Sequence, residues 1–186
     1  GVSYWVWLSD RTNDVRQRFQ EACNRFASRI DRKNGDVHWW RGLLVQDYYG
    51  TSGNDNGAIF YDANVWQGAA NSKASVLWGP ILTELWKDTN TWGPPISDVT
   101  EAWPSPPRDN GKGPRTTGSL VRFNNLDAYY NSHKNAVYVV SDVAKNMFDA
   151  LGGTGGFMGF PEANGAWAQA SGVSQSEGFY QPFEGA

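Results

Sequence analysis

The chain of 186 residues is long enough for one domain or two small ones, and its single cysteine, Cys23, excludes an internal disulfide. Its 16 basic and 19 acidic residues give a net charge of −3, which argues against a nucleic-acid partner. Its apolar runs are all shorter than the roughly 18–20 residues that cross a bilayer, so we expect no membrane insertion. The 10 Trp, 8 Tyr and 9 Phe beside 21 Gly indicate short elements joined by turns, with aromatic rings left for a surface.

The N-terminal region is expected to hold one strand and one helix. Residues 4–8 form a short apolar run that is typical of a strand. Val15, Phe19 and Cys23 recur at helical spacing among polar residues, which predicts a helix over residues 13–30. Because Cys23 lies on the apolar stripe of this helix, we expect it to be an inert core thiol.

A hairpin is predicted next. Residues 43–49 and 58–61 are β-prone and flank the polar stretch 50–57, which is rich in Gly, Asn and Asp. These are the residues that turns between antiparallel strands favour.

Two later segments share one pattern. Residues 76–86 and 138–148 each give a strand, a turn pair and then apolar residues at helical spacing, and each follows an aromatic strand, at 59–61 and 128–130. A third unit begins at Gly159 and breaks off after one aromatic strand. We expect the N-terminal strand and helix to supply its missing half.

Turns rich in Gly and Pro follow both copies, as Trp92-Gly93-Pro94-Pro95 and Met158-Gly159-Phe160-Pro161. Together with Leu151-Gly152-Gly153 and Phe183-Glu184-Gly185, this punctuation resembles the LGFP repeat over roughly residues 42–186. LGFP repeats occur as tandem modules in cell-envelope and secreted proteins and are associated with binding cell-wall polysaccharide. The resemblance implies a secreted, extracellular protein whose partner is cell-wall polysaccharide.

These patterns lead to a definite expectation for the fold. We expect an α+β fold of about three strand–strand–helix LGFP-like repeats in a closed pseudo-symmetric ring, with the N-terminal strand and helix completing the last repeat. The chain is read as a single monomeric domain, with the Pro-rich stretch at 103–115 as an internal loop. Its parts are the N-terminal strand and helix at 1–35, repeat one at 36–90, repeat two at 91–152 and a partial repeat three at 153–186.

The sequence offers little for metal or cofactor chemistry. His38 and His133 are the two histidines and stand in different repeat contexts, without the spacing of a zinc site. The Gly-rich stretch at residues 152–156 lacks the Gly-Lys-Ser/Thr ending of a phosphate loop and is predicted to be a turn. We therefore expect no metal and no cofactor.

Carboxylates are the remaining reactive groups, and the two copies serve as controls for each other. Asp62 stands where the second copy has Asn131, so the shared scaffold does not require a charge there. If Tyr49 faces Ala58, Asp47 lies diagonal to Asp62 on one sheet face, roughly 7–8 Å away. That separation overlaps the ~6.5–9.5 Å of an inverting glycosidase pair. Asp47 and Asp62 are therefore the candidate catalytic pair, although either could be an ordinary surface acid.

Asp10, Asp14 and Glu162 are further candidate acids. For Asp10 and Asp14 the simpler interpretation is a role at the start of the first helix, where carboxylates cap the chain or interact with the helix dipole.

Aromatic residues near the predicted pair could bind a glycan, because sugar rings present apolar C–H faces that stack on amphipathic aromatic rings. Adjacent residues of an extended strand point to opposite faces, so at least one of Trp39 and Trp40 is expected to be exposed. The predicted substrate-binding residues are Trp39, Trp40, Tyr48, Tyr49 and Trp66.

Two hypotheses of function follow. The first is a glycoside hydrolase that cleaves peptidoglycan in the manner of a muramidase or lysozyme, by means of Asp47 and Asp62. The alternative is a noncatalytic cell-wall polysaccharide-binding LGFP module. The extra helix and acids of the first unit place the hydrolase slightly ahead.

Overall fold

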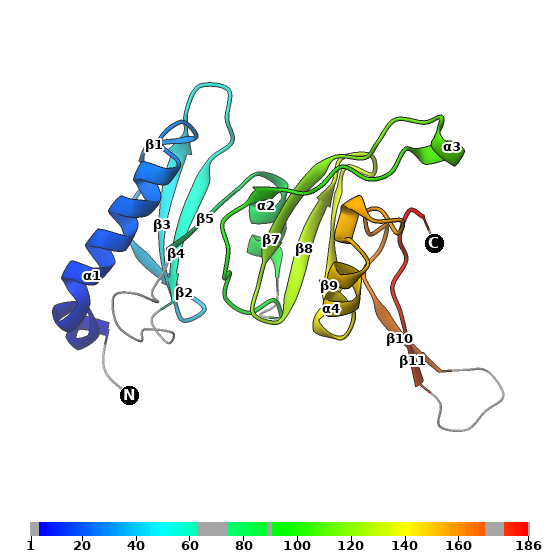
Figure 1. Cartoon of the computed structure of the whole chain (residues 1–186). Helices are drawn as coiled ribbons and strands as arrows, with labels where there is room; N and C mark the ends of the chain where they lie inside the picture. The colour runs from blue at the N-terminus through cyan, green and yellow to red at the C-terminus, as the bar shows by residue number, and fades with distance from the viewer. Residues whose placement is uncertain (1–3, 63–73, 89–90, 170–176, 186) are drawn as a thin grey trace. The chain divides into compact units, whose positions relative to one another are not determined.

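The computed structural model describes residues 4–62, 74–88, 91–169 and 177–185, with side chains from residue 13 onward in the first helix (Figure 1). The fold is mixed α+β, with mostly antiparallel sheets and few helices. Two compact units form, over residues 1–82 and 83–186. The single-domain interpretation stays a prediction.

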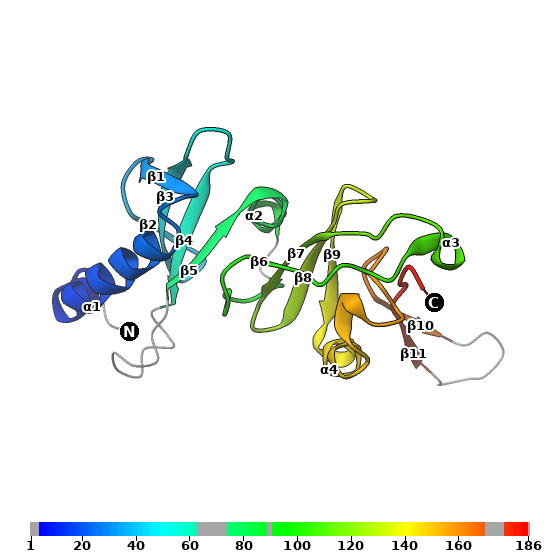
Figure 2. The same ribbon diagram turned by 45° about the horizontal axis from the view of Figure 1, so that its top comes forward.

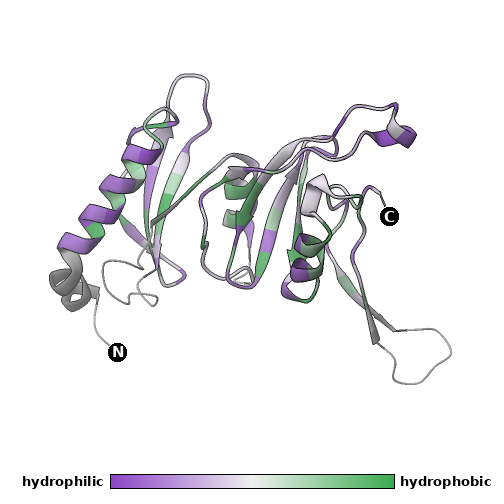
Figure 3. Cartoon of the chain, in the orientation of Figure 1, coloured by the Kyte–Doolittle hydropathy of each residue, from purple (hydrophilic) through white to green (hydrophobic). Residues whose placement is uncertain are grey.

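The first unit is a sheet with a long helix against it. The strands are β1 (Ile30–Lys33), β2 (His38–Trp40), β3 (Leu43–Gly50), β4 (Gly57–Asp62) and β5 (Ala74–Trp78), in the order β1-β3-β4-β5 with β2 also paired to β3. Helix α1 (Tyr4–Arg25) contacts β4 and β5, and Figures 1 and 2 both show it beside the sheet. Figure 3 shows polar and apolar residues alternating along α1, as an amphipathic helix requires.

The N-terminal prediction was wrong in two respects. Residues 4–8 continue α1 instead of forming a strand, and the helix ends at Arg25 rather than Ile30. A short apolar run does not distinguish strand from helix, and neither Gly nor Pro interrupts the chain between Leu8 and Asn13. The helix packs on the sheet of its own unit through Ala22 and its neighbours.

Helix α2 (Gly79–Lys87) contains the boundary between the units. The second unit has a sheet ordered β6-β7-β8-β9, with helix α4 after β9, and a separate two-stranded sheet β10-β11 (Figure 2). The elements are β6 (Thr100–Glu101), a helical turn α3 (Arg108–Gly111), β7 (Gly118–Arg122), β8 (Leu126–Asn131), β9 (Ala136–Ser141), α4 (Asp142–Ala150), η2 (Gly153–Gly155), β10 (Ala166–Gln169) and β11 (Glu177–Tyr180). The predicted succession of strand and helix is confirmed in β5–α2 and in β9–α4.

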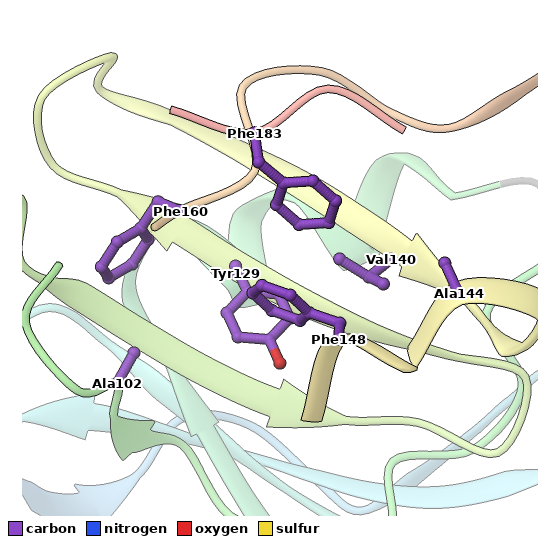
Figure 4. Close-up of a cluster of buried hydrophobic side chains, with 7 residues drawn as sticks. All are labelled: Ala102, Tyr129, Val140, Ala144, Phe148, Phe160 and Phe183. Carbon is purple, nitrogen blue, oxygen red and sulfur yellow. The ribbon is translucent and has the colours of Figure 1, made fainter. Parts of the chain in front are cut away.

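Helix α4 is held to its sheet by a core of aromatic rings (Figure 4). Phe148 stacks on Phe183 with ring centroids 4.6 Å apart, and its other neighbour is Tyr129, edge-on at 5.5 Å. Ala144, one turn before Phe148, is also buried, so one face of the helix meets the sheet. Each fully buried Phe of this kind contributes about 1.5–3 kcal/mol to folding.

The two Pro-containing turns are anchored alike. Each is tied to a later segment by one β-bridge and by a 3.0 Å backbone hydrogen bond. The bridges are Pro95↔Phe123 and Pro161↔Phe183, and the hydrogen bonds run from Asn124 to Pro94 and from Glu184 to Phe160. The two turns therefore make equivalent backbone contacts, with Pro94 corresponding to Phe160 and Pro95 to Pro161, as the sequence patterns of the two copies predict. Within the described ranges none of the three sheets closes into a barrel, and the predicted ring is not confirmed.

Candidate functional site

The predicted carboxylate pair depends on the register of the β3–β4 hairpin, and that register differs from the expected one. Asp47 lies opposite Ala58, and Asp62 lies opposite Leu43. The shift is two residues, so both acids stay on one face of the sheet. In this register Asp47 and Asp62 are four residues apart along the paired strands, so their backbone positions are roughly 13–14 Å apart. The predicted diagonal contact was wrong, and the structure does not bring the two carboxylates together as an acid–base pair.

Asp47 nevertheless has a distinctive environment. Its Oδ2 lies 3.7 Å from Nδ1 of His38, and its side chain is 34% exposed. Burial raises the pKa of the Asp47 carboxyl, and the nearby His38 opposes that rise. Asp47 therefore has one histidine neighbour, while Asp62, its predicted partner, lies too far along the strands for paired acid–base catalysis.

Of the first predicted aromatic pair, one ring is exposed and the other is packed. Trp39 is 36% exposed. Trp40 meets Phe60 edge-on with ring centroids 6.0 Å apart, and the guanidinium of Arg41 lies 4.7 Å from the centroid of its ring. The prediction that at least one of the two is exposed is confirmed.

The second aromatic pair divides in the same way. Tyr48 is 4% exposed, and its hydroxyl oxygen accepts a 3.2 Å hydrogen bond from the Cys23 thiol, so its predicted role in binding glycan was wrong. Tyr49 is exposed and lies under Arg32. Trp39 pairs with Leu44, five residues before Tyr49 on β3, so the two exposed rings do not share one groove. Trp66 lies outside the described residues.

A better-formed site lies in the second unit. Trp103 is 78% exposed, the most exposed of the large apolar side chains that the structure describes. It stands at the edge of a cavity of about 350 Å³, which we call the Trp103 cavity. Its lining consists of Ala102, Trp103, Leu120, Arg122, Tyr129, Asp149, Gly152, Gly153 and Thr154.

One wall of the Trp103 cavity is the Gly-rich turn that follows α4. Thr154, which is 3% exposed, donates its hydroxyl hydrogen to the Trp103 carbonyl oxygen at 2.6 Å. Gly152 has φ +96°, a conformation that glycine adopts without strain. A Cβ on Gly155 would lie only 3.0 Å from the Cβ of Trp103, so glycine permits the turn to approach the aromatic segment. The turn thus fixes the backbone that carries the exposed ring.

The floor of the Trp103 cavity carries a charged network. Nη1 of Arg122 donates hydrogen bonds to Oδ2 of Asp127 and, at 2.9 Å, to Oδ2 of Asp149. Nη2 of Arg122 reaches the second oxygen of Asp149 at 3.3 Å. Asp149 and Arg122 are each about two-fifths exposed, whereas Asp127 is 1% exposed. The buried Asp127 therefore holds the Arg122 guanidinium on its solvent-shielded side. Arg122 and Asp149 present their polar groups to the cavity.

Burial shifts the pKa values of two side chains in and beside this network, Asp127 and Tyr129. Burial raises the pKa of Asp127, and Arg122 opposes that rise. Burial is also the main cause of the raised pKa of Tyr129, which therefore keeps its phenolic proton. Because Asp127 is shielded from solvent, Asp149 is the carboxylate that the cavity offers to a ligand. The arrangement suits the binding of hydroxyl groups rather than paired acid–base catalysis.

A signal for this site is present in the sequence of the Pro-rich stretch. Trp103 is followed by Pro104 and opens the Pro-rich loop, and a large aromatic residue in a loop indicates a surface role. Its hydrogen-bond partner Thr154 lies in the Gly-rich stretch 152–156, and nothing in the local sequence of that turn indicates the contact with Trp103.

Comparisons with known proteins give no assignment: no protein-family model matches the chain, and no curated protein matches it. Among the described residues there is no group of three or more His, Cys, Asp and Glu side chains that could hold a metal ion. In the same part of the chain, no helix combines the length and apolar character needed to cross a membrane.

Proposed function

We propose that the protein is a noncatalytic carbohydrate-binding module and that its ligand lies in the Trp103 cavity. The observation that carries this proposal is the Trp103 ring, 78% exposed and fixed at its backbone beside a preformed cavity that has both apolar and charged walls. The partner would be a bacterial cell-wall polysaccharide outside the cell, and the module would act as a monomer. The LGFP resemblance supports that choice of glycan, and the two alike turns support the repeat interpretation.

The chemistry of a sugar ring agrees with this cavity. A pyranose has an apolar C–H face that stacks on an aromatic ring and a rim of hydroxyl groups that both donate and accept hydrogen bonds. Asp149 supplies acceptors and Arg122 supplies donors, and both are held by their shared hydrogen bonds. The volume of about 350 Å³ is at the lower end of the usual range for small-molecule sites, ~300–1,000 Å³. One or two sugar units of a longer chain would fit such a site.

The distinguishing experiment incubates the protein with purified bacterial peptidoglycan and with the wall polysaccharide released from it. Pelleting measures binding, and turbidity with reducing-end analysis measures cleavage. Saturable retention without new reducing ends is expected. A loss of turbidity with new reducing ends would contradict a noncatalytic module.

The second candidate is the muramidase-type hydrolase, and Asp47 is the observation that favours it. Its pKa is raised by burial, as a general acid requires, and the exposed ring of Tyr49 lies two residues after it on β3. The Asp47→Asn variant tests this candidate. If the wild type releases reducing ends and the variant loses about 10²–10⁴-fold in rate while still binding, hydrolysis through Asp47 replaces the binding-only function.

A further inference from the structure

The first unit contains a second pocket, between α1 and the sheet, which the proposed function does not use. It encloses about 200 Å³, and its apolar walls come from Val15 and Phe19 of α1, from Val37 and from Leu44 of β3. Val15 and Leu44 are buried, at 6% and 0% exposure, so the floor of the pocket belongs to the core. Such a floor favours an apolar group over water.

Two cations stand at the rim of this pocket. Arg16 of α1 and Lys33 of β1 both line it and are exposed. Neither has an ion-pair or hydrogen-bond partner among the described residues. Two carboxylates near them in the sequence are paired with other cations, since Asp14 pairs with Arg18 and Asp31 pairs with Arg32. The rim therefore offers two unneutralised positive charges above an apolar floor.

Gln46 closes the polar side of the pocket. Its side chain is 3% exposed, and its amide nitrogen donates to the carbonyl oxygens of Gly35, at 2.9 Å, and Asp47, at 3.0 Å. The bond to Gly35 and the 2.9 Å hydrogen bond from the Asn34 amide to the Asp47 carbonyl oxygen hold the 34–37 loop, which carries Val37, against β3. The pocket is thus supported by internal hydrogen bonds, as expected of a preformed site.

We infer that this pocket binds a small amphipathic monoanion, a free carboxylate with a short acyl chain or a single ring. The apolar floor takes the tail, and Arg16 and Lys33 take the carboxylate from either side. The small volume excludes drug-sized ligands, which occupy roughly 300 Å³ or more. This inference is independent of glycan binding, because every residue involved belongs to the first unit.

The test uses octanoate as the probe, with octanol as its uncharged counterpart and acetate as its counterpart without a tail. Amide resonances of Val15, Val37 and Gln46 are followed by ¹H–¹⁵N NMR titration. Octanoate is expected to give saturable shifts at these three positions and to bind about tenfold more tightly than octanol, since two exposed charge contacts are lost with the alcohol. Acetate is expected to give no saturable shift.

Two kinds of variant extend the test. The double variant Arg16→Gln and Lys33→Gln should weaken octanoate about tenfold, whereas Lys112→Gln in the other unit should leave it unchanged. Val37→Trp should fill the pocket and abolish saturable binding while the midpoint of urea unfolding stays near the wild-type value. Equal affinity for octanol and octanoate, unchanged affinity in the double variant, or shifts confined to other residues would each overturn the inference. If Val37→Trp fails to fold, the charge variants still decide the matter.

Discussion

The hydroxyl group of Thr154 donates a hydrogen bond to the carbonyl oxygen of Trp103 at 2.6 Å, across 51 positions of sequence. Thr154 is buried and Trp103 is largely exposed, so the bond joins the core of the second unit to its most exposed aromatic ring. The Gly-rich turn and the Pro-rich segment therefore behave as one structural element. Their contact fixes the backbone that carries the ring on which a sugar would stack.

Removing this bond should cost stability. Thr154→Val keeps the shape of the side chain but leaves the Trp103 carbonyl oxygen without its donor, and we expect the free energy of unfolding to fall by about 1–2 kcal/mol. Thr154→Ser keeps the hydroxyl and should lose less. Urea denaturation measures both. Equal losses in the two variants would show that the methyl group, not the hydrogen bond, stabilises the turn.

The buried amide of Asn131 provides a second prediction. Its Nδ2 donates to the Pro161 carbonyl oxygen at 3.2 Å and to Oε1 of Glu184 at 3.3 Å, and Asn131 is 0% exposed. Asn131→Asp introduces the residue of the first copy, Asp62, and places a second carboxylate against Glu184. We expect a loss of about 3 kcal/mol or more in the free energy of unfolding.

The partner substitution distinguishes charge repulsion from a general loss of packing. In the Asn131→Asp, Glu184→Gln double variant the new amide can donate to the new carboxylate, so the double variant should be more stable than the sum of the two single losses implies. Additive losses would mean that the two side chains are not coupled.

The stability of the first unit should depend on pH through Asp47. Burial raises the pKa of this carboxyl in the folded state above its ordinary value of 3.8. Between the two values the folded chain holds a proton that the unfolded chain has lost, so the contribution of Asp47 to stability is present at low pH and is lost as pH rises through the folded pKa. The effect should be below about 1 kcal/mol, because the carboxyl is partly solvated.

Urea unfolding of the wild type and Asp47→Asn, compared between pH 4 and pH 7, measures this effect. The wild type should gain stability relative to the variant as the pH is lowered. A gain in the opposite direction would mean that His38, not burial, dominates the environment of Asp47.

Local patterns predicted much of the fold. The β3–β4 hairpin follows from the Gly- and Asn-rich stretch between two β-prone runs, and helices α2 and α4 follow from apolar residues at helical spacing. The register of the hairpin did not follow. A Cβ on Gly57 would lie 2.9 Å from Cγ2 of Ile30, so the start of β4 packs closely against β1. The residues of the turn between β3 and β4 carry no information about this packing.

The candidate site was less predictable for the same reason. One ring of each adjacent aromatic pair had to be more buried than the other, but the sequence does not say whether Tyr48 or Tyr49 faces α1. The Trp103 cavity joins residues from the segment after β6, from β7, from β8, from α4 and from the turn after α4. Only the folded chain brings these five segments together.

The most direct test of the account is a binding isotherm on insoluble cell-wall polysaccharide for three proteins: the wild type, Trp103→Ala and Trp167→Ala. Trp167 is the matched control, because it is 62% exposed but lies on β10, outside the Trp103 cavity. We expect Trp103→Ala to weaken binding by about 1–3 kcal/mol, the usual contribution of an aromatic stacking platform, and Trp167→Ala to bind like the wild type. Wild-type affinity in a folded Trp103→Ala protein would contradict this expectation.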